Sequence, residues 1–285
     1  MSRPELASEA GPLRERLDGW RRDGLRIGLV PTMGNLHEGH LALVRAASAE
    51  ADRVVTSIFV NPLQFAPGED FDAYPRTLDE DLDRLSAADC ALVFVPTEAT
   101  MYPNGRQLAT RVEVPGLSDI LCGTLRPGHF SGVATVVARL FNLVQPEIAV
   151  FGAKDFQQLA VIRRMAEDLH FRVRILAVPT RREADGLAMS SRNSYLTAAE
   201  RRRAPAIYQA LAEAARALAG GRRDFVALQQ AGMENMRSAG LEPEYFEIRR
   251  PQGLEPPAPT DRSLVVLAAA RLGRARLIDN LAVDL

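Results

Sequence analysis

The amino-acid sequence predicts an α/β protein: a doubly wound, Rossmann-like parallel sheet with a smaller C-terminal α+β domain. Up to about residue 180, short apolar runs rich in β-branched residues alternate with segments of helical periodicity, as a parallel sheet with crossover helices requires. From Arg181 onward this alternation gives way to two long helical segments and a terminal pair of strand-like runs. We therefore expect a Rossmann-like domain that binds nucleotide and substrate at 1–180 and a smaller α+β domain that closes over the site at 181–285.

The first domain is expected to open with a strand, a loop, a helix and a second strand. The apolar run 26–31 ends in a proline, 40–52 has apolar residues at helical spacing, and 53–60 is β-branched. Farther along, Thr77 and Glu80 have the spacing of a capping box ahead of a helix. The remaining predictions are strands at 91–95, 148–151 and 173–178, with helices at 133–144 and 155–169.

The second domain is expected to combine helices with a hairpin. Thr197 and Glu200 form a second candidate capping box, and the helix that it starts is predicted to run to Gly220–Gly221. The remaining predictions are a helix between Asp224 and Ala239, a Pro-rich loop at 251–259, and strands 263–272 and 275–280 joined at Gly273–Arg274.

Composition and charge restrict the class of protein. The chain has 285 residues, 47% hydrophobic and 25% charged, with a formal net charge of −1. No apolar run approaches the roughly 20 residues of a membrane span, and the near-neutral balance argues against a general nucleic-acid binder. The N-terminus lacks the apolar stretch of a signal peptide, and Cys90 and Cys122 stand at no metal or redox spacing. We expect a cytoplasmic protein with small-molecule substrates and with neither a nucleic-acid nor a membrane partner.

The loop after the strand at 26–31 has the features of a phosphate site. It leads into a helix, whose N-terminus favours anions, and its sequence is Met33-Gly34-Asn35-Leu36-His37-Glu38-Gly39-His40. His37 and His40 can both donate hydrogen bonds to phosphate oxygens. A metal site and a purely structural pair are the alternatives, but no further ligand cluster completes a zinc set. The dinucleotide fingerprint and the P-loop are also absent from this loop, which favours a phosphate site of the HxGH kind.

Lys154 is the only lysine among the 35 lysine and arginine residues. It follows the strand at 148–151 in the segment Gly152-Ala153-Lys154-Asp155, and ligands of open α/β sheets bind outside the carboxyl ends of strands. A compact, flexible ammonium at that rim can neutralise phosphate charge during group transfer. Chance retention of one lysine is the competing explanation, and Asp155 can also serve as a simple helix cap.

A third polar group, Met189-Ser190-Ser191-Arg192-Asn193, lies just after the expected domain boundary. Its two serine hydroxyls and its guanidinium can donate to an oligophosphate, although Ser/Asn clusters are usually turns. A position between two domains would suit a loop that closes over a bound nucleotide.

Together, the HxGH pair, the single lysine and the Ser-Ser-Arg loop resemble the adenylate-forming nucleotidyltransferase superfamily. The chain is more closely similar to the pantothenate synthetase family, whose consecutive motifs it matches in order over residues 30 to 280. These motifs are PTMGNLHEGH, SIFVNPLQF, YPRTLDEDL, RPGHFSGVATVV, FGAKDFQQLAVIR, GLAMSSRNSYL and RLIDN. Single motifs such as PTMG or SSRN are not specific, but the ordered combination is.

The resemblance implies an ATP-dependent ligase that joins pantoate to β-alanine through a pantoyl-adenylate, with release of AMP and pyrophosphate. It also implies a homodimer formed through the N-terminal domain, with Mg²⁺ carried mainly by the phosphates of ATP. The implied catalytic residues are His37, His40 as proton donor, Lys154, Ser190, Ser191 and Arg192. The implied nucleotide contacts are Met33, Gly34, Asn35, Leu36, His37, Glu38, Gly39, His40, Gly152, Ala153, Lys154, Asp155, Arg181, Met189, Ser190, Ser191 and Arg192.

For the substrate, the resemblance assigns Gln64 and Gln158 to pantoate, with Asn61 and Arg126 in support. Two neutral amides can bond the hydroxyls of a hydroxy acid while its carboxylate stays nucleophilic. Asp81 is expected as an outer-shell contact of Mg²⁺, although acids at a helix start are common because of the helix dipole alone.

Position 153 departs from the family pattern, since Ala153 stands where the family usually reads Gly-Glu-Lys-Asp. A glutamate side chain is therefore expected to be dispensable at this position. At Arg181, the resemblance implies that only the main chain contacts the adenine. Two alternatives stay open at this point. Another nucleotidyltransferase would not need two amides beside the α-phosphate, and a non-catalytic nucleotide sensor would not need intact His37, His40 and Lys154.

Overall fold

The structure is a computed structural model that describes residues 3–66 and 68–285. It contains two compact units, the first comprising the chain up to Ala153 together with 161–179, and the second comprising 154–160 and 180–285. The change of unit at Thr180 lies beside the expected boundary, while the short segment that holds Lys154 groups with the second unit.

The first unit contains a six-stranded sheet in the order β1-β4-β3-β2-β5-β6, in which every pair is parallel. Because the strand order runs in both directions from β2, the topology is doubly wound, as the sequence predicts. The strands are β1 (Glu5–Ala7), β2 (Ile27–Thr32), β3 (Arg53–Ile58), β4 (Leu92–Phe94), β5 (Ile148–Gly152) and β6 (Arg174–Val178).

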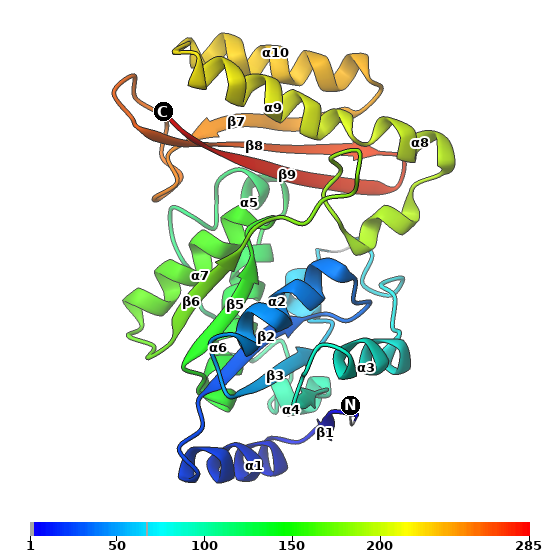
Figure 1. Ribbon diagram of the computed structural model, residues 1–285, viewed down its shortest axis with the longest axis vertical. Helices are drawn as coiled ribbons and strands as arrows, with labels where there is room; N and C mark the ends of the chain where they lie inside the picture. The colour runs from blue at the N-terminus through cyan, green and yellow to red at the C-terminus, as the bar shows by residue number, and fades with distance from the viewer. Residues whose placement is uncertain (1–2, 67) are drawn as a thin grey trace. The chain divides into compact units, whose positions relative to one another are not determined.

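Helices cover both faces of this sheet, which explains the continuous apolar strands (Figure 1). Val30 of β2 lies in the apolar cluster beneath α2 and α3, whereas the alternation of strand side chains turns its buried neighbour Leu29 to the other face. The helical elements up to β6 are α1 (Ala10–Arg22), α2 (Glu38–Ser48), η1 (Pro62–Gln64), α3 (Leu78–Ser86), α4 (Glu98–Met101), α5 (Cys122–Leu125), α6 (His129–Val144) and α7 (Phe156–Asp168).

The predicted capping box at Thr77 and Glu80 is wrong. Thr77 has φ −124° and ψ 49°, and its side chain makes no cap hydrogen bond. Its hydroxyl instead donates to Oδ2 of Asp81 at 3.3 Å. Helix α3 still begins at Leu78, and its buried residues Leu82 and Leu85 form an apolar stripe that stabilises the helix.

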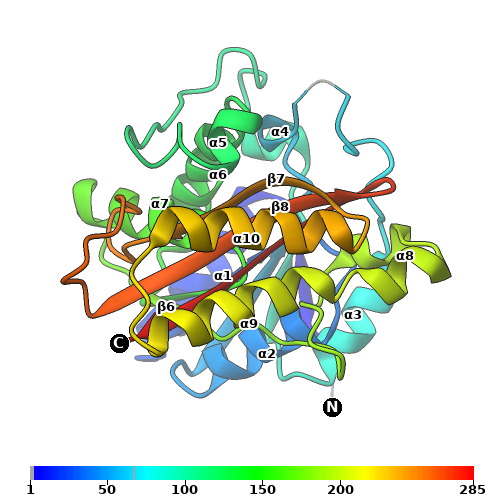
Figure 2. The ribbon, with the colours of Figure 1, turned by 90° about the horizontal axis from the view of Figure 1, so that it is seen from above.

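The second unit contains a three-stranded antiparallel sheet in the order β7-β8-β9. Its strands are β7 (Glu242–Arg249), β8 (Ser263–Leu272) and β9 (Ala275–Asp284). Helices α9 (Ala206–Ala219) and α10 (Phe225–Ser238) lie side by side on this sheet (Figure 2). The predicted hairpin is confirmed, with Gly273 at φ 57° in its turn. Strand β7 is not predicted from the sequence, because its three glutamates and one proline hide the strand pattern.

The single helix predicted from Thr197 to Gly220 is wrong, because it is divided into α8 (Ala198–Arg203) and α9. Pro205 stands at the division, where it lacks the N–H that a continuous helix would require. The capping box itself is confirmed: Oγ1 of Thr197 accepts from the Glu200 N–H, and Oε2 of Glu200 accepts from the Thr197 N–H. Across the described residues, we find no helix with the length and apolar character to cross a membrane.

Candidate active site

The loop between β2 and α2 carries the histidine pair of the first unit. Gly34 has φ 84° and Asn35 has φ 49°, so two successive residues adopt left-handed conformations. A Cβ on Gly34 would lie 3.1 Å from both Oδ2 of Asp81 and Cγ2 of Ile58. Glycine is thus favoured at this position both for its conformation and for the space that it leaves.

Asp81 of α3 stabilises this loop conformation. Its carboxylate is buried, and it accepts hydrogen bonds from the main-chain N–H of Asn35 at 2.9 Å and of Leu36 at 2.7 Å. Arg84, on the same helix, donates to the carbonyl oxygen of Leu36. The role that the structure gives Asp81 is therefore to shape the loop, and its outer-shell contact with Mg²⁺ stays a prediction. Within residues 3–66 and 68–285, no group of three or more His, Cys, Asp or Glu could hold a metal ion.

His37 and His40 begin α2 with a reciprocal pair of hydrogen bonds. Nδ1 of His37 accepts from the Gly39 N–H at 3.1 Å, and Nδ1 of His40 accepts from the His37 N–H at 3.3 Å. Their ring centroids are 4.1 Å apart. A main-chain N–H can only donate, so each neutral ring carries its proton on Nε2. Two Nε2–H donors at a helix N-terminus are well suited to bind a phosphate.

Gln64 and Met33 come together although they belong to different segments. Nε2 of Gln64 lies 2.9 Å from Sδ of Met33. Asn61, which is buried at the start of η1, donates through Nδ2 to Oε1 of Gln64 at 3.1 Å. Helix α6 packs tightly on η1, because a Cβ on Gly132 would lie 2.1 Å from the Leu63 carbonyl oxygen. Three of the predicted substrate and nucleotide residues thus form one cluster.

Arg126 supports the main chain of Gln64. It donates to both carboxylate oxygens of Glu69 at 2.6 Å and to the Gln64 carbonyl oxygen at 3.3 Å. Burial raises the pKa of Glu69, but the hydrogen bonds and the charge of Arg126 outweigh that effect and hold the pKa below its ordinary value. The structure accordingly gives Arg126 a supporting place beside Gln64.

His129 contacts the same carbonyl oxygen. Its Nδ1 lies 2.7 Å from the Gln64 carbonyl oxygen, and its Nε2 lies 3.1 Å from NH1 of Arg126. Because a carbonyl oxygen can only accept, Nδ1 carries the ring proton, and Nε2 accepts from Arg126. The η1 segment is therefore bound by main-chain as well as side-chain contacts.

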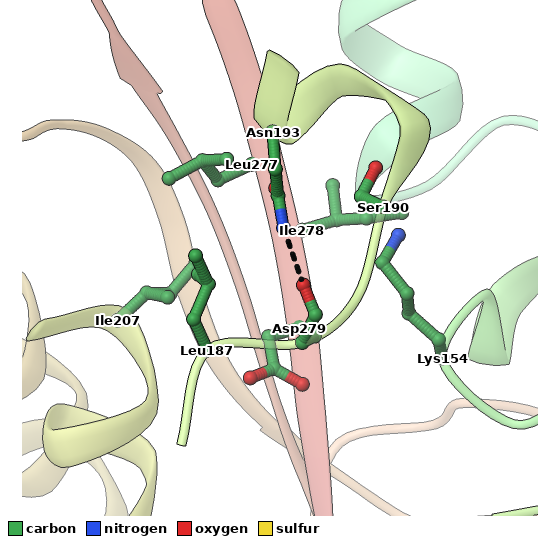
Figure 3. Close-up of a pocket in the computed structure, with 9 residues that line it drawn as sticks. Lys154, Leu187, Ser190, Asn193, Ile207, Leu277, Ile278 and Asp279 are labelled. Carbon is green, nitrogen blue, oxygen red and sulfur yellow. Dashed lines mark hydrogen bonds between the residues drawn. The ribbon is translucent and has the colours of Figure 1, made fainter. Parts of the chain in front are cut away.

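In the second unit, Lys154 and Ser190 line one small pocket, together with Asn193, Asp279 and apolar side chains (Figure 3). The Lys154 side chain is directed toward Ser190 in this view. Two of the three predicted phosphate-binding segments therefore meet within this unit. The apolar lining residues are Leu187, Ala188, Ile207, Leu277 and Ile278.

A buried ion pair lies beside this pocket. Asp279 of β9 is 3% exposed and accepts two hydrogen bonds from Arg182, at 2.6 and 3.0 Å. The Arg182 guanidinium carbon lies 4.2 Å from the ring centroid of Tyr208. Burial raises the pKa of Asp279, although Arg182 opposes this rise. The next residue, Asn280, donates through Nδ2 to the Lys154 carbonyl oxygen at 2.8 Å, so β9 contacts both Arg182 and the lysine turn.

The segment after Arg181 contains more regular structure than the predicted loop. The Met189 N–H donates to the Arg181 carbonyl oxygen at 2.9 Å. Ser190 begins the 3-10 helix η2 (Ser191–Tyr195), and its hydroxyl oxygen accepts from the Arg192 N–H at 3.3 Å. Asn193 donates through Nδ2 to the Ala188 carbonyl oxygen at 3.0 Å, the dashed line of Figure 3. Ser191 and Arg192 thus lie on a short helical turn.

The other predicted residues have local contacts. Glu38 forms an ion pair with Arg45 at 3.0 Å. Gly152 ends β5, and the Ala153 N–H donates to the Val178 carbonyl oxygen at 2.8 Å. Asp155 accepts at its carbonyl oxygen from the Leu159 N–H at the start of α7, and Gln158 lies half-buried on that helix.

Several residues that take part in these contacts were not predicted as site residues from the sequence. His129 and Asp279 lie in the motifs RPGHF and RLIDN, so motif membership could have singled them out. Tyr102, whose hydroxyl donates to Oδ1 of Asn61 at 2.7 Å, belongs to none of the quoted motifs. Arg182 has no distinguishing signal among the many arginines of this chain.

Comparison with known proteins gives one consistent family. Residues 5–282 match the family model described as pantoate–β-alanine ligase. Pantothenate synthetases of Thioalkalivibrio sulfidiphilus and Pseudomonas aeruginosa are 61% and 56% identical to this chain over 96% of its length and 96% of theirs. The crystal structure of pantothenate synthetase from Thermus thermophilus is 46% identical, covers 97% of this chain and 98% of its own, and superposes with a TM-score of 0.91.

A second solved structure adds ligands. The pantoate–β-alanine ligase of Francisella tularensis, described as complexed with β-γ ATP and β-alanine, is 32% identical and has a TM-score of 0.82. The match covers 98% of this chain and 97% of that protein.

Proposed function

This chain belongs to the pantoate–β-alanine ligase family, and we propose that it condenses pantoate with β-alanine to pantothenate, using ATP. The ligands of the Francisella relative support ATP and β-alanine as substrates. The family match favours this function over another nucleotidyltransferase or a non-catalytic nucleotide sensor.

The first step is adenylate formation. A carboxylate oxygen of pantoate attacks the α-phosphorus of ATP, the bond to the bridging oxygen breaks, and pyrophosphate leaves. Catalysis then consists mainly of positioning and of charge stabilisation on the phosphates. No covalent bond to the protein is needed.

The observation that carries the proposal is the histidine pair. His37 and His40 each accept a main-chain N–H at Nδ1, which leaves the ring proton on Nε2 and makes both rings hydrogen-bond donors. We assign these donors to the phosphates of ATP. The ammonium of Lys154 and the Ser190–Arg192 turn would neutralise the departing pyrophosphate, and a direction of Lys154 toward Ser190 supports a shared ligand (Figure 3).

The substrate residues would act through neutral groups. Gln64 and Gln158 can bond the hydroxyls of pantoate without neutralising the carboxylate that must attack. In the second step the amine of β-alanine attacks the acyl carbon, loses a proton, and AMP leaves with the electron pair of the acyl–oxygen bond. Asn61 and Arg126 would support Gln64 in both steps.

Mg²⁺ would enter with ATP. The described residues contain no cluster of carboxylates for it, and both oxygens of Asp81 already accept main-chain hydrogen bonds. Mg²⁺ keeps several waters and commonly binds substrate phosphates. When bound there, it would lower the negative charge that the attacking carboxylate approaches.

We also propose a cytoplasmic location and a homodimer. Two buried cysteines, Cys90 and Cys122, that form no disulfide are compatible with a reducing compartment. The homodimer rests on the family resemblance, and light scattering on the purified chain would test it.

Pantoate-dependent exchange of labelled pyrophosphate into ATP, without β-alanine, tests the adenylate step. We expect exchange in the wild type and a loss of about 10²–10³-fold in Lys154→Ala, since that variant lacks a charge at the leaving group. A control is Arg174→Ala, which removes an exposed cation paired with Glu50 and should leave exchange unchanged. Absence of exchange in folded wild-type protein would contradict the acyl-adenylate mechanism.

A further inference from the structure

Three neutral side chains of the first unit form a continuous chain of hydrogen bonds. The hydroxyl of Tyr102 donates to Oδ1 of Asn61 at 2.7 Å, and Nδ2 of Asn61 donates to Oε1 of Gln64 at 3.1 Å. Nε2 of Gln64 lies 2.9 Å from Sδ of Met33. The chain thus runs from a buried phenol to the amide that we assign to pantoate.

Main-chain groups determine the orientation of the Asn61 amide. Its Oδ1 accepts from the Leu63 N–H at 3.2 Å, and its Nδ2 donates to the Gly132 carbonyl oxygen at 3.1 Å. Neither main-chain group can exchange its role, because an N–H only donates and a carbonyl oxygen only accepts. A flipped amide would set donor against donor and acceptor against acceptor.

The same logic determines the direction of the other two members. Since Oδ1 of Asn61 can only accept, the proton of the Tyr102 hydroxyl must lie between the two oxygens. Since Nδ2 can only donate, Gln64 must present its oxygen to Asn61 and turn its NH₂ group outward. The present neighbour of that NH₂ group is a thioether, a weak acceptor that a substrate oxygen can replace.

Tyr102 is held firmly at the inner end of this chain. It is 2% exposed. Its ring centroid lies 5.1 Å from the Arg139 guanidinium carbon and 6.2 Å from the ring centroid of Phe59. Arg139 in turn donates to the Met101 carbonyl oxygen at 2.9 Å. Burial raises the pKa of the Tyr102 hydroxyl well above its ordinary value, so the group stays a donor throughout the working range of pH.

We propose that Tyr102 is a positioning residue that, through Asn61, holds the NH₂ end of Gln64 toward pantoate and so selects a hydrogen-bond acceptor at that point of the substrate. The inference rests on the proposed function. A hydroxyl or carboxylate oxygen of pantoate satisfies this donor. An analogue with a methylene group in its place would leave the donor unpaired, and a site built to bond a substrate oxygen discriminates strongly against such an analogue.

The test is Tyr102→Phe, which removes one hydroxyl and keeps the ring. In the pyrophosphate exchange assay we expect the KM for pantoate to rise about tenfold, as for a hydrogen bond lost from a binding network, with the KM for ATP unchanged. We also expect weaker discrimination between pantoate and its two deoxy analogues, each lacking one hydroxyl. Tyr245→Phe, the same change on β7 of the second unit, is the matched control and should alter neither KM.

A second variant, Asn61→Asp, keeps the shape but cannot donate to Gln64. Gln64 should then turn its NH₂ group inward and its oxygen outward, and the KM for pantoate should rise further than in Tyr102→Phe. An unchanged KM for pantoate in Tyr102→Phe, or equal losses for pantoate and ATP, would overturn the positioning role. Absence of exchange in the wild type would instead overturn the proposed function itself, so the two failures are distinguishable.

Discussion

Two buried polar networks, one in each unit, differ in charge. In the first unit, Tyr102, Asn61 and Gln64 are joined by hydrogen bonds between neutral groups. In the second unit, Arg182 and Asp279 form an ion pair with two hydrogen bonds. The first network includes Gln64 and the second lies beside Lys154, and we assign both of these residues to substrates.

The difference in charge corresponds to the groups that each network positions. A neutral chain can orient an amide without placing a charge beside the pantoate carboxylate, whose nucleophilicity the reaction needs. An ion pair can join β9 to the segment 181–189 through a bidentate Arg–carboxylate contact, the most directional kind of ionic contact. Burying those charges is costly unless both stay paired, so the second network should be far more sensitive to the loss of one member.

The largest expected effect is that of Asp279→Ala. The variant leaves a mostly buried guanidinium, 17% exposed in its side chain, without its carboxylate. We expect a loss of about 3–5 kcal/mol in the free energy of unfolding, measured by urea denaturation of the whole chain. Tyr102→Phe should lose only about 1 kcal/mol, as for one neutral hydrogen bond.

The matched control replaces both partners, as Arg182→Met with Asp279→Leu. Apolar residues of similar size often replace a buried ion pair with little loss of stability. If Asp279→Ala were as stable as the wild type, the contrast between the two networks would be wrong.

Gly132→Ala tests the neutral network without changing any of its polar groups. The new Cβ would lie 2.1 Å from the Leu63 carbonyl oxygen and 2.7 Å from the Gln64 nitrogen, so α6 and η1 must separate. We expect the free energy of unfolding, measured by thermal denaturation, to fall by about 1–3 kcal/mol. We also expect a higher KM for pantoate. Gly19→Ala in α1, whose Cβ would have no neighbour within 4 Å, is the control and should not lower stability. A normal KM for pantoate in a stable Gly132→Ala would show that the spacing of α6 and η1 does not govern Gln64.

The smallest expected effect concerns Glu69, which forms an ion pair with Arg126 in the first unit. Its pKa is lowered from 4.5 in the folded protein, so it stabilises the fold above that value and loses this contribution as the pH falls through the lowered pKa. Glu69→Gln should therefore flatten the fall in melting temperature between about pH 6 and pH 3. If the melting temperature of Glu69→Gln fell as steeply with pH as that of the wild type, other carboxylates would dominate the acid sensitivity.

The elements that the sequence predicted correctly are those with a strong local pattern. The alternation of buried strands and helices, the capping box at Thr197 and the hairpin at Gly273 all follow from periods or turn residues within a short window. Errors arose where a local signal had a stronger competitor. Thr77 donates to Asp81 in place of capping α3, and Pro205 interrupts the helix that the capping box begins.

The candidate site divides in the same way. His37, His40 and Lys154 were predicted as site residues because they stand at a strand end or beside a helix start, and Gln64 was predicted from the family resemblance of its motif. Tyr102 could not be found in this manner. It bonds Asn61 across 41 positions of the chain, and no period or spacing relates the two.

The sequence by itself determined the α/β class, the alternation of strands and helices in the first unit, the C-terminal hairpin and the family, because these depend on local patterns and on motifs in a fixed order. Only the tertiary structure decided which groups meet and which way they face. The orientation of the Gln64 amide depends on main-chain groups of η1 and α6 and on a phenol from a third segment. Which end of an amide donates and which accepts depends on neighbours that are distant in the sequence, and no local pattern in the sequence identifies those neighbours.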